Sequence, residues 1–168
     1  MHYRHLESPI GPLLIAGDEA GLRFVLFGRG RHEVHPKPDW EPDRGALTEA
    51  ISELTAYFSG KLRDFTIPVA PEGTPFQQRV WAALQGITYG ETISYGELAR
   101  RIGNPKAVRA VGLANGSNPI SIVIPCHRVI GSNGSLVGYG GGLPVKQALL
   151  ALERGQRTLL DASDVTVA

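Results

Sequence analysis

The chain has 168 residues, and 42% of them are hydrophobic, which is enough for a buried core in one large domain or two small ones. Its single cysteine excludes an internal disulfide and a cysteine-rich zinc site, and no stretch approaches the roughly 20 apolar residues of a membrane-spanning helix. The formal net charge of +1 excludes the strongly basic class of nucleic-acid-binding domains.

The charge differs between the two halves of the chain. Residues 1–70 carry 8 Lys and Arg against 10 Asp and Glu, whereas residues 71–168 carry 9 against 6. An anionic partner is therefore expected to bind the second half. Residues 1–5 lack the apolar core of a signal peptide, and a lone cysteine is typical of a reducing compartment, so the sequence predicts a cytoplasmic protein.

The first half begins with a predicted antiparallel sheet. Apolar residues with strand spacing lie at 3–6, 13–16 and 22–27, and turn-forming residues separate the three segments. Residues 31–44 are polar and contain three prolines, which indicates a surface loop. The two histidines of that loop, His32 and His35, are too few ligands for a metal ion, so no metal site is predicted.

A helix is predicted to pack on this sheet. Its apolar residues follow a three-or-four spacing over 47–59, and Gly60 stands where a left-handed C-terminal cap belongs. An edge strand is then indicated by the alternating residues Phe65, Ile67 and Val69. Residues 70–73 resemble a linker, so the first domain is predicted to span residues 1–70.

The second half is predicted to be helical, over a domain of residues 74–155 followed by a tail at 156–168. Thr74 and Gln77 have the spacing of a capping box, with proline at the first helical position. Ser94 and Glu97 repeat that spacing at the start of another helix. The next helix, over 106–115, is expected to begin at once with Asn104 as its cap and Pro105 as its first residue.

Two short helices joined by a tight connection have the form of a helix-turn-helix. On the second of them, one face of the helical projection is a stripe of small residues at Ala107, Ala110 and Ala114. This stripe allows tight packing on a neighbouring helix, or close approach to a nucleic-acid backbone or groove. The residue pattern does not choose between the two.

Cys126 and His127 are the strongest candidates for chemistry, because the only thiol of the chain stands next to an imidazole. A thiol attacks as thiolate, and a neighbouring base raises the thiolate fraction. A lone cysteine is more often a small buried hydrophobe. Glu153, at the end of the last helix, could orient the imidazole, although the pattern favours an ordinary solvated carboxylate there. Three hypotheses stay open: a cysteine hydrolase, a group-transfer protein acting on nucleic acid, and a DNA-binding module with a silent cysteine.

Residues 125–129, preceded by Asn118 and Pro119, resemble the active-site segment of the methylated-DNA–protein-cysteine methyltransferases, also called O6-alkylguanine-DNA alkyltransferases. The similarity continues in family order over nearly the whole chain, in residues 8–13, 76–81, 89–95, 104–112, 138–142 and 149–153. The resemblance implies direct reversal of DNA damage: an O6-alkylguanine, and possibly an O4-alkylthymine, rotates out of the duplex, and its alkyl group moves irreversibly to the cysteine, once per molecule.

The resemblance also implies an α/β fold with two domains. A small ribonuclease-H-like sheet domain would precede a helical, winged-helix-like domain with a helix-turn-helix that binds the minor groove of double-stranded DNA. It implies a monomer, with cooperative binding on DNA left open, and no cofactor. The structural zinc of some family members is not possible in that form, because this chain has one cysteine.

Site residues follow from the resemblance position by position. Cys126 is the alkyl acceptor, His127 activates it through a water molecule, Glu153 orients the imidazole, and Asn118 supports the turn. Contacts to DNA and to the flipped base are implied for Tyr95, Arg109, Val129, Tyr139, Gly140, Ala107, Ala110 and Gly112.

The chain departs from the family pattern in two places. Gly140 stands where some members have a serine, so only a backbone amide could donate to O6 of the base. Leu113 replaces a small residue on the recognition helix of some members. Two alternatives remain: a protein that binds DNA lesions without transfer, against which the presence of Cys126 argues, and a cysteine hydrolase, which would turn over.

Overall fold

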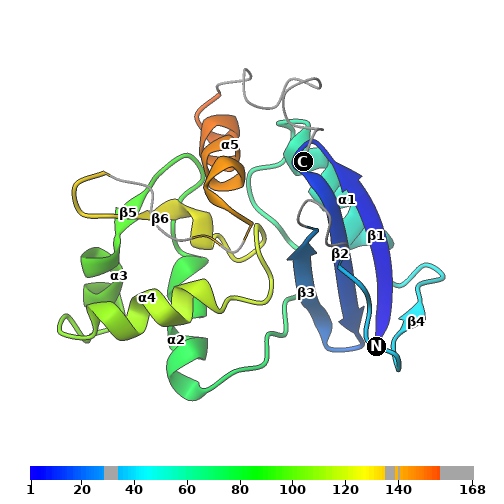
Figure 1. The fold of residues 1–168 in the computed structure, drawn as a ribbon, viewed down its shortest axis with the longest axis horizontal. Helices are drawn as coiled ribbons and strands as arrows, with labels where there is room; N and C mark the ends of the chain where they lie inside the picture. Colours follow the sequence, from blue (N-terminus) through cyan, green and yellow to red (C-terminus); the bar gives the residue numbers. More distant parts are fainter. Residues whose placement is uncertain (29–33, 135–138, 140, 156–168) are drawn as a thin grey trace.

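The computed structural model describes residues 1–28, 34–134, 139 and 141–155. A sheet and one helix form one side of the molecule, and a group of short helices forms the other, with the last helix lying between them (Figure 1). His32, Gly140 and the expected tail at 156–168 lie outside the described residues. No helix in the described part of the chain is long and apolar enough to cross a membrane.

The first side is a four-stranded sheet of order β3-β2-β1-β4. The three predicted strands are confirmed as β1 (His2–Ser8), β2 (Gly11–Asp18) and β3 (Gly21–Phe27), paired antiparallel. The short β4 (Glu41–Pro42) pairs parallel with β1 inside the segment expected to be a loop. The helix α1 (Thr48–Phe58) follows, and Gly60 has the left-handed φ of 75° that was expected.

The predicted edge strand at Phe65, Ile67 and Val69 is wrong. Among the described residues, only Val69 of this segment forms a bridge, with Leu22. The amides of Thr66 and Ile67 instead donate to the Glu53 carboxylate on α1, at 2.9 and 3.1 Å, and Pro68 has no amide to donate. A side chain from another element has therefore taken the donors that a strand would need.

The helical side contains α2 (Pro75–Leu84), α3 (Tyr95–Arg101), α4 (Val108–Gly116) and α5 (Leu143–Glu153). A small parallel pair is formed by β5 (Ile93–Ser94) and β6 (Val129–Ile130). The capping box of Thr74 and Gln77 is confirmed in both directions. The second box forms only by half, because Ser94 accepts from the Glu97 amide while the Glu97 carboxylate pairs with two arginines of α3.

The second helix of the helix-turn-helix begins at Val108 rather than at 106. Gly103 has a φ of 79°, and the amides of Gly103 and Asn104 donate to the carbonyls of Arg100 and Ala99. This is the double hydrogen bond that closes a helix with a left-handed cap. Because Asn104 belongs to the end of α3, one more turn of chain is needed before α4 can start.

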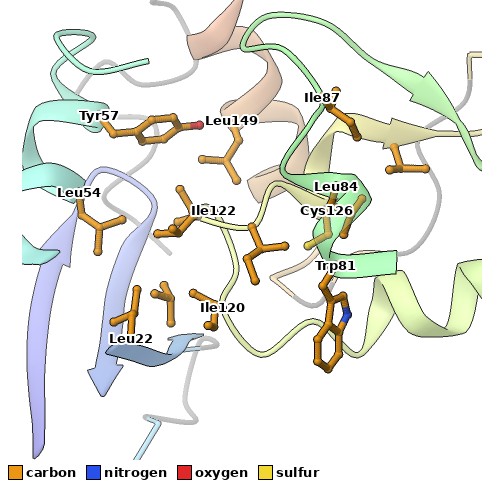
Figure 2. Close-up of a cluster of buried hydrophobic side chains, with 14 of the residues drawn as sticks. Leu22, Leu54, Tyr57, Trp81, Leu84, Ile87, Ile120, Ile122, Cys126 and Leu149 are labelled. Carbon is orange, nitrogen blue, oxygen red and sulfur yellow. The ribbon is translucent and has the colours of Figure 1, made fainter. Parts of the chain in front are cut away.

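One buried cluster joins the two sides (Figure 2). Leu54 and Tyr57 of α1 and Leu149 of α5 belong to it together with Ile120 and Ile122 from the segment before Cys126. The amide of Val25 on β3 donates to the Pro119 carbonyl at 3.0 Å, which attaches this segment to the sheet. The run at 120–124 is buried throughout, and it holds the cysteine loop against both sides.

Candidate active site

Cys126 is the first residue of a single turn of 3-10 helix, η1 (Cys126–Arg128), and it is only 5% exposed. Its amide donates to the Ile124 carbonyl at 2.8 Å, so the backbone on both sides of the thiol is tightly turned. Burial raises the pKa of the Cys126 thiol, and hydrogen bonds from Asn118 and Ser121 and the charge of Lys146 oppose that rise only in part. In the unliganded protein the sulfur is therefore a thiol.

Asn118 holds the turn that leads to this cysteine. Its Oδ1 accepts from the Ile120 amide at 3.0 Å and its Nδ2 donates to the Ile124 carbonyl at 2.7 Å. Between these two anchors, Ile122 has a φ of +74°, a left-handed conformation that a β-branched residue rarely adopts and that costs about 1–3 kcal/mol. The burial of Ile122 and the two bonds of Asn118 stabilise the turn against this strain.

His127 is completely buried, and its Nε2 lies 2.7 Å from Oε2 of Glu153. Burial lowers the pKa of His127, and the nearby carboxylate of Glu153 counteracts this only in part. The imidazole is therefore neutral at pH 7, with its proton on Nε2 donated to the carboxylate. Its Nδ1 is buried and makes no hydrogen bond to any described residue, so a lone pair is available there to take a proton.

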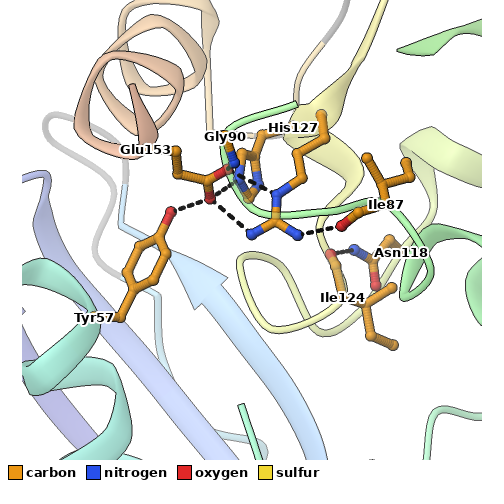
Figure 3. Close-up of polar contacts among 8 residues, drawn as sticks. Tyr57, Ile87, Gly90, Asn118, Ile124, His127 and Glu153 are labelled. Carbon is orange, nitrogen blue, oxygen red and sulfur yellow. Dashed lines mark hydrogen bonds and ion pairs between the residues drawn. The ribbon is translucent and has the colours of Figure 1, made fainter. Parts of the chain in front are cut away.

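Glu153 is the centre of the polar network and not the solvated carboxylate that the residue pattern favours (Figure 3). Its Oε1 accepts from Nε of Arg128 at 2.7 Å and from the Gly90 amide at 3.3 Å. Its Oε2 accepts from His127, from Nη2 of Arg128 at 3.0 Å and from the Tyr57 hydroxyl at 2.6 Å. Burial alone would raise the pKa of this carboxyl, but the bonds to His127 and Arg128 outweigh it and hold the pKa well below its usual range.

The expected DNA-contacting residues lie on the outer side of the helix-turn-helix. Arg109 and Ala110 are exposed on α4, and Ala107 is half-buried just before it. A Cβ placed on Gly112 would lie 3.9 Å from the ring of Tyr95, so this glycine faces the first residue of α3. Leu113 is 73% exposed, which is unusual for a leucine on a short helix.

One end of the alanine stripe packs on a neighbouring helix, and the middle of the stripe is exposed. Ala114 is buried, and its carbonyl accepts from Nε1 of Trp81 at 2.8 Å, so this end of the stripe packs on α2. Ala110 is exposed and available to a ligand. Val108, at the start of α4, is 40% exposed, whereas Val111 is buried.

The residues expected around the base lie near the cysteine on three separate segments. Tyr95 is half-buried, and burial raises the pKa of its hydroxyl, which stays protonated. Tyr139 packs edge-on against Phe27 of β3, with the ring centroids 5.6 Å apart. Val129 is buried directly after η1. Gly140, the fourth expected residue, lies outside the described residues.

Two family models match the chain. The DNA-binding domain of the 6-O-methylguanine DNA methyltransferases matches residues 75–155, and their ribonuclease-like domain matches residues 1–71. Together the matches cover nearly the whole chain. The chain belongs to the 6-O-methylguanine DNA methyltransferase family. The predicted fold class, a ribonuclease-like domain followed by a DNA-binding domain, is thereby confirmed.

Curated relatives of this methyltransferase family match along almost their full length. A methylated-DNA–protein-cysteine methyltransferase of Methanosarcina acetivorans is 55% identical over 153 residues, which are 91% of this chain and 98% of the relative. One from Mycobacterium tuberculosis is 53% identical over 156 residues, 93% of this chain and 94% of the relative. The crystal structure of Mycobacterium tuberculosis OGT in complex with DNA superposes with a TM-score of 0.86 at 52% identity, covering 96% of this chain and 100% of that one.

Three residues of this candidate site were not singled out from the sequence. Arg128 binds Glu153 with two nitrogens and donates Nη1 to the Ile87 carbonyl at 2.7 Å. Lys146 is fully buried on α5, and its Nζ donates to the Val129 carbonyl at 2.6 Å. Tyr57 reaches Glu153 from α1. Arg128 could have been noticed from its place beside His127, whereas no local pattern marks the other two.

Proposed function

We propose that Cys126 takes one alkyl group from O6-alkylguanine in DNA, irreversibly and once per molecule. His127 and Glu153, which we call the relay, remove the proton from the thiol. The observation that carries this proposal is the buried, unpartnered Nδ1 of a neutral imidazole, next in the chain to the only thiol of the protein. The family of the chain supports it, since its members are named for transfer to a protein cysteine.

The transfer needs a thiolate, and the relay produces it by removing the Cys126 proton when a lesion is bound. The Cys126 proton passes to Nδ1 of His127 through a water molecule, and Glu153 stabilises the imidazolium that forms. The sulfur then attacks the alkyl carbon, an S–C bond forms, and the electrons of the broken C–O bond go to O6 of the guanine. Because the pKa of Cys126 is raised and that of His127 is lowered, the pair stays neutral until a lesion is bound.

The base would be held by groups around the cysteine. A hydroxyl donor to the ring nitrogen, assigned to Tyr95, makes guanine a better leaving group. The carbonyls of Cys126 and Val129 would accept from the exocyclic amine. In the structure the Cys126 carbonyl accepts from Asn115 at 3.4 Å and from the Val129 amide, and the Val129 carbonyl accepts from Lys146, so the exocyclic amine of the base would share or replace these donors. Tyr139 would line the pocket, and the Gly140 amide would donate to O6.

DNA would bind through its minor groove to α3 and α4. Ala107, Ala110 and Gly112 allow close approach, and Arg109 would fill the space left in the stack when the base rotates out. Extrusion costs a few kcal/mol, less for an alkylated pair that is already weakened. The structural similarity to a DNA complex of a relative supports this placement.

Several finer features belong to the same proposal. O4-alkylthymine is a second candidate substrate, because its alkyl group is carried on an equivalent exocyclic oxygen. The active form would be a monomer, with a domain boundary between residues 70 and 74. A free cysteine with a chemical role favours a reducing compartment, so we place the reaction in the cytoplasm.

Intact-mass spectrometry tests the proposal directly. The protein is mixed with a duplex that contains one O6-methylguanine, and Cys126→Ser serves as the control. We expect one added methyl on the wild type, reaching a plateau at one equivalent, and none on the variant. Binding of the duplex without any change of mass would instead support a lesion-binding protein, and repeated release of product would support a hydrolase.

A further inference from the structure

Tyr57 connects the first half of the chain to the proposed relay. It lies on α1, 96 residues before Glu153, and its hydroxyl donates to Oε2 of Glu153 at 2.6 Å (Figure 3). Both side chains are fully buried. This Oε2 is the same oxygen that accepts from His127. Two hydrogen bonds through Glu153 therefore connect the tyrosine to His127, the group that receives the Cys126 proton.

The position of the Tyr57 hydroxyl is set by packing around its ring. The rings of Phe58 and Phe65 lie 5.4 Å from it, centroid to centroid, and the ring of Tyr89 lies at 6.2 Å. Burial, followed by the charge of Glu153, raises the pKa of Tyr57 well above its usual range, so the phenol stays a donor at every working pH. A fixed donor to one carboxylate oxygen sets the orientation of the carboxylate and reduces the negative charge that this oxygen presents to His127.

We propose that Tyr57 is a positioning residue for the transfer reaction: it fixes Glu153 from the ribonuclease-like domain and moderates how strongly the carboxylate stabilises a protonated His127. The inference rests on the proposed function of Cys126. The other charged groups near His127 and Glu153 are Arg128 of η1 and Lys146 of α5, and the hydroxyls of Tyr89 and Tyr139 also interact with the charge of the Glu153 carboxylate. None of these is on the element that carries Tyr57.

The effect of Tyr57 on His127 has a definite sign. A donor withdraws negative charge from the Glu153 carboxylate, which lowers the proton affinity of the imidazole. Removing the hydroxyl returns that charge, so His127 should become protonated at a higher pH. Since a protonated imidazole cannot accept the Cys126 proton, the acid side of the rate profile should move toward neutral pH.

The test is the pH profile of single-turnover methyl transfer from an O6-methylguanine duplex at saturating DNA, measured on the full chain. Tyr57→Phe should shift the acid limb upward, so that transfer at about pH 6 is roughly three- to tenfold slower while the plateau changes less. Replacement of Tyr57 by difluorotyrosine keeps the shape and strengthens the donor, so its acid limb should shift in the opposite direction.

Tyr89→Phe is the matched control. Its ring contacts that of Tyr57, but its hydroxyl makes no hydrogen bond to a residue in the described ranges, so its profile should overlie that of the wild type. Profiles for Tyr57→Phe and the difluorotyrosine protein that also overlie the wild type, or that shift in the same direction, would overturn the inference. If Tyr57→Phe does not fold, the isosteric difluorotyrosine protein decides alone. A wild type that transfers no methyl would reject the proposed function itself.

Discussion

Burial shifts the pKa values of Cys126, His127 and Glu153 to different extents and in different directions. Burial raises the pKa of the thiol and lowers that of the imidazole, so both are neutral in the unliganded protein. For Glu153 the donors around it outweigh burial and the carboxylate stays charged. The site thus holds one fixed negative charge that is ready to stabilise a positive charge on the imidazole.

Glu153→Gln removes this charge and tests it. The amide leaves the buried guanidinium of Arg128 without its counter-charge, so we expect the free energy of unfolding to fall by about 3 kcal/mol. Methyl transfer should slow roughly 100-fold, because the protonated imidazole loses its stabiliser. Urea unfolding and single-turnover kinetics measure the two effects. Glu91→Gln, at an exposed carboxyl, is the control, and equal rates for both variants would argue against the relay.

The helix-turn-helix is organised by interactions at the level of whole elements. The hydrogen bonds that close α3 at Gly103 and Asn104 delay the start of α4 to Val108. Because α2 covers Ala114 and leaves Arg109 and Ala110 exposed, the exposed face of α4 is the one that we propose for DNA.

Arg109→Ala tests the role of this free face. The side chain is exposed, so the free energy of unfolding should change by less than about 0.5 kcal/mol. Transfer from duplex DNA should slow roughly tenfold or more, because the extruded base would no longer be replaced in the stack. The measurement is single-turnover transfer with thermal melting as the stability check. Arg44→Ala, which removes an exposed arginine before α1, should transfer at the wild-type rate.

At the scale of the whole molecule, one core joins the sheet to the helices, so the titration of the site affects global stability. The ordinary pKa is 6.5 for His127 and 4.5 for Glu153, and both are lower in the folded protein. The unfolded chain therefore binds more protons than the folded chain below those values, and the free energy of unfolding must fall as the pH falls. The free energy of unfolding begins to fall near pH 6.5 because of His127, and it falls further below about pH 4.5 because of Glu153.

We expect the free energy of unfolding to drop by about 1 kcal/mol between about pH 7.5 and about pH 5.5, where His127 is the group that titrates. Urea unfolding at the two pH values measures it. His127→Gln should lose most of this dependence, whatever its absolute stability. An unchanged pH dependence in that variant would show that His127 has the same pKa in the folded and the unfolded chain.

Alkylation should also affect the whole molecule. Cys126 is 5% exposed among packed neighbours, so an added methyl group overfills its site and should lower the free energy of unfolding by about 1–3 kcal/mol. Thermal melting of protein that has reacted with one equivalent of the methylated duplex checks this. Cys126→Ser treated in the same way should melt unchanged, and a reacted protein that melts like the unreacted one would show that the site has spare room.

Local chemistry in the sequence was sufficient for many features. The capping box at Thr74, the left-handed Gly60 and the strands of the sheet depend on neighbours within a few residues, and the motif around Cys126 identified the family. Tertiary structure decided the rest. The Glu53 carboxylate accepts from amides of the segment predicted to be a strand, and Tyr57, Arg128 and Lys146 reach the site from three separate elements. Burial and long-range hydrogen bonds have no local pattern, because they depend on which segments the folded core brings together.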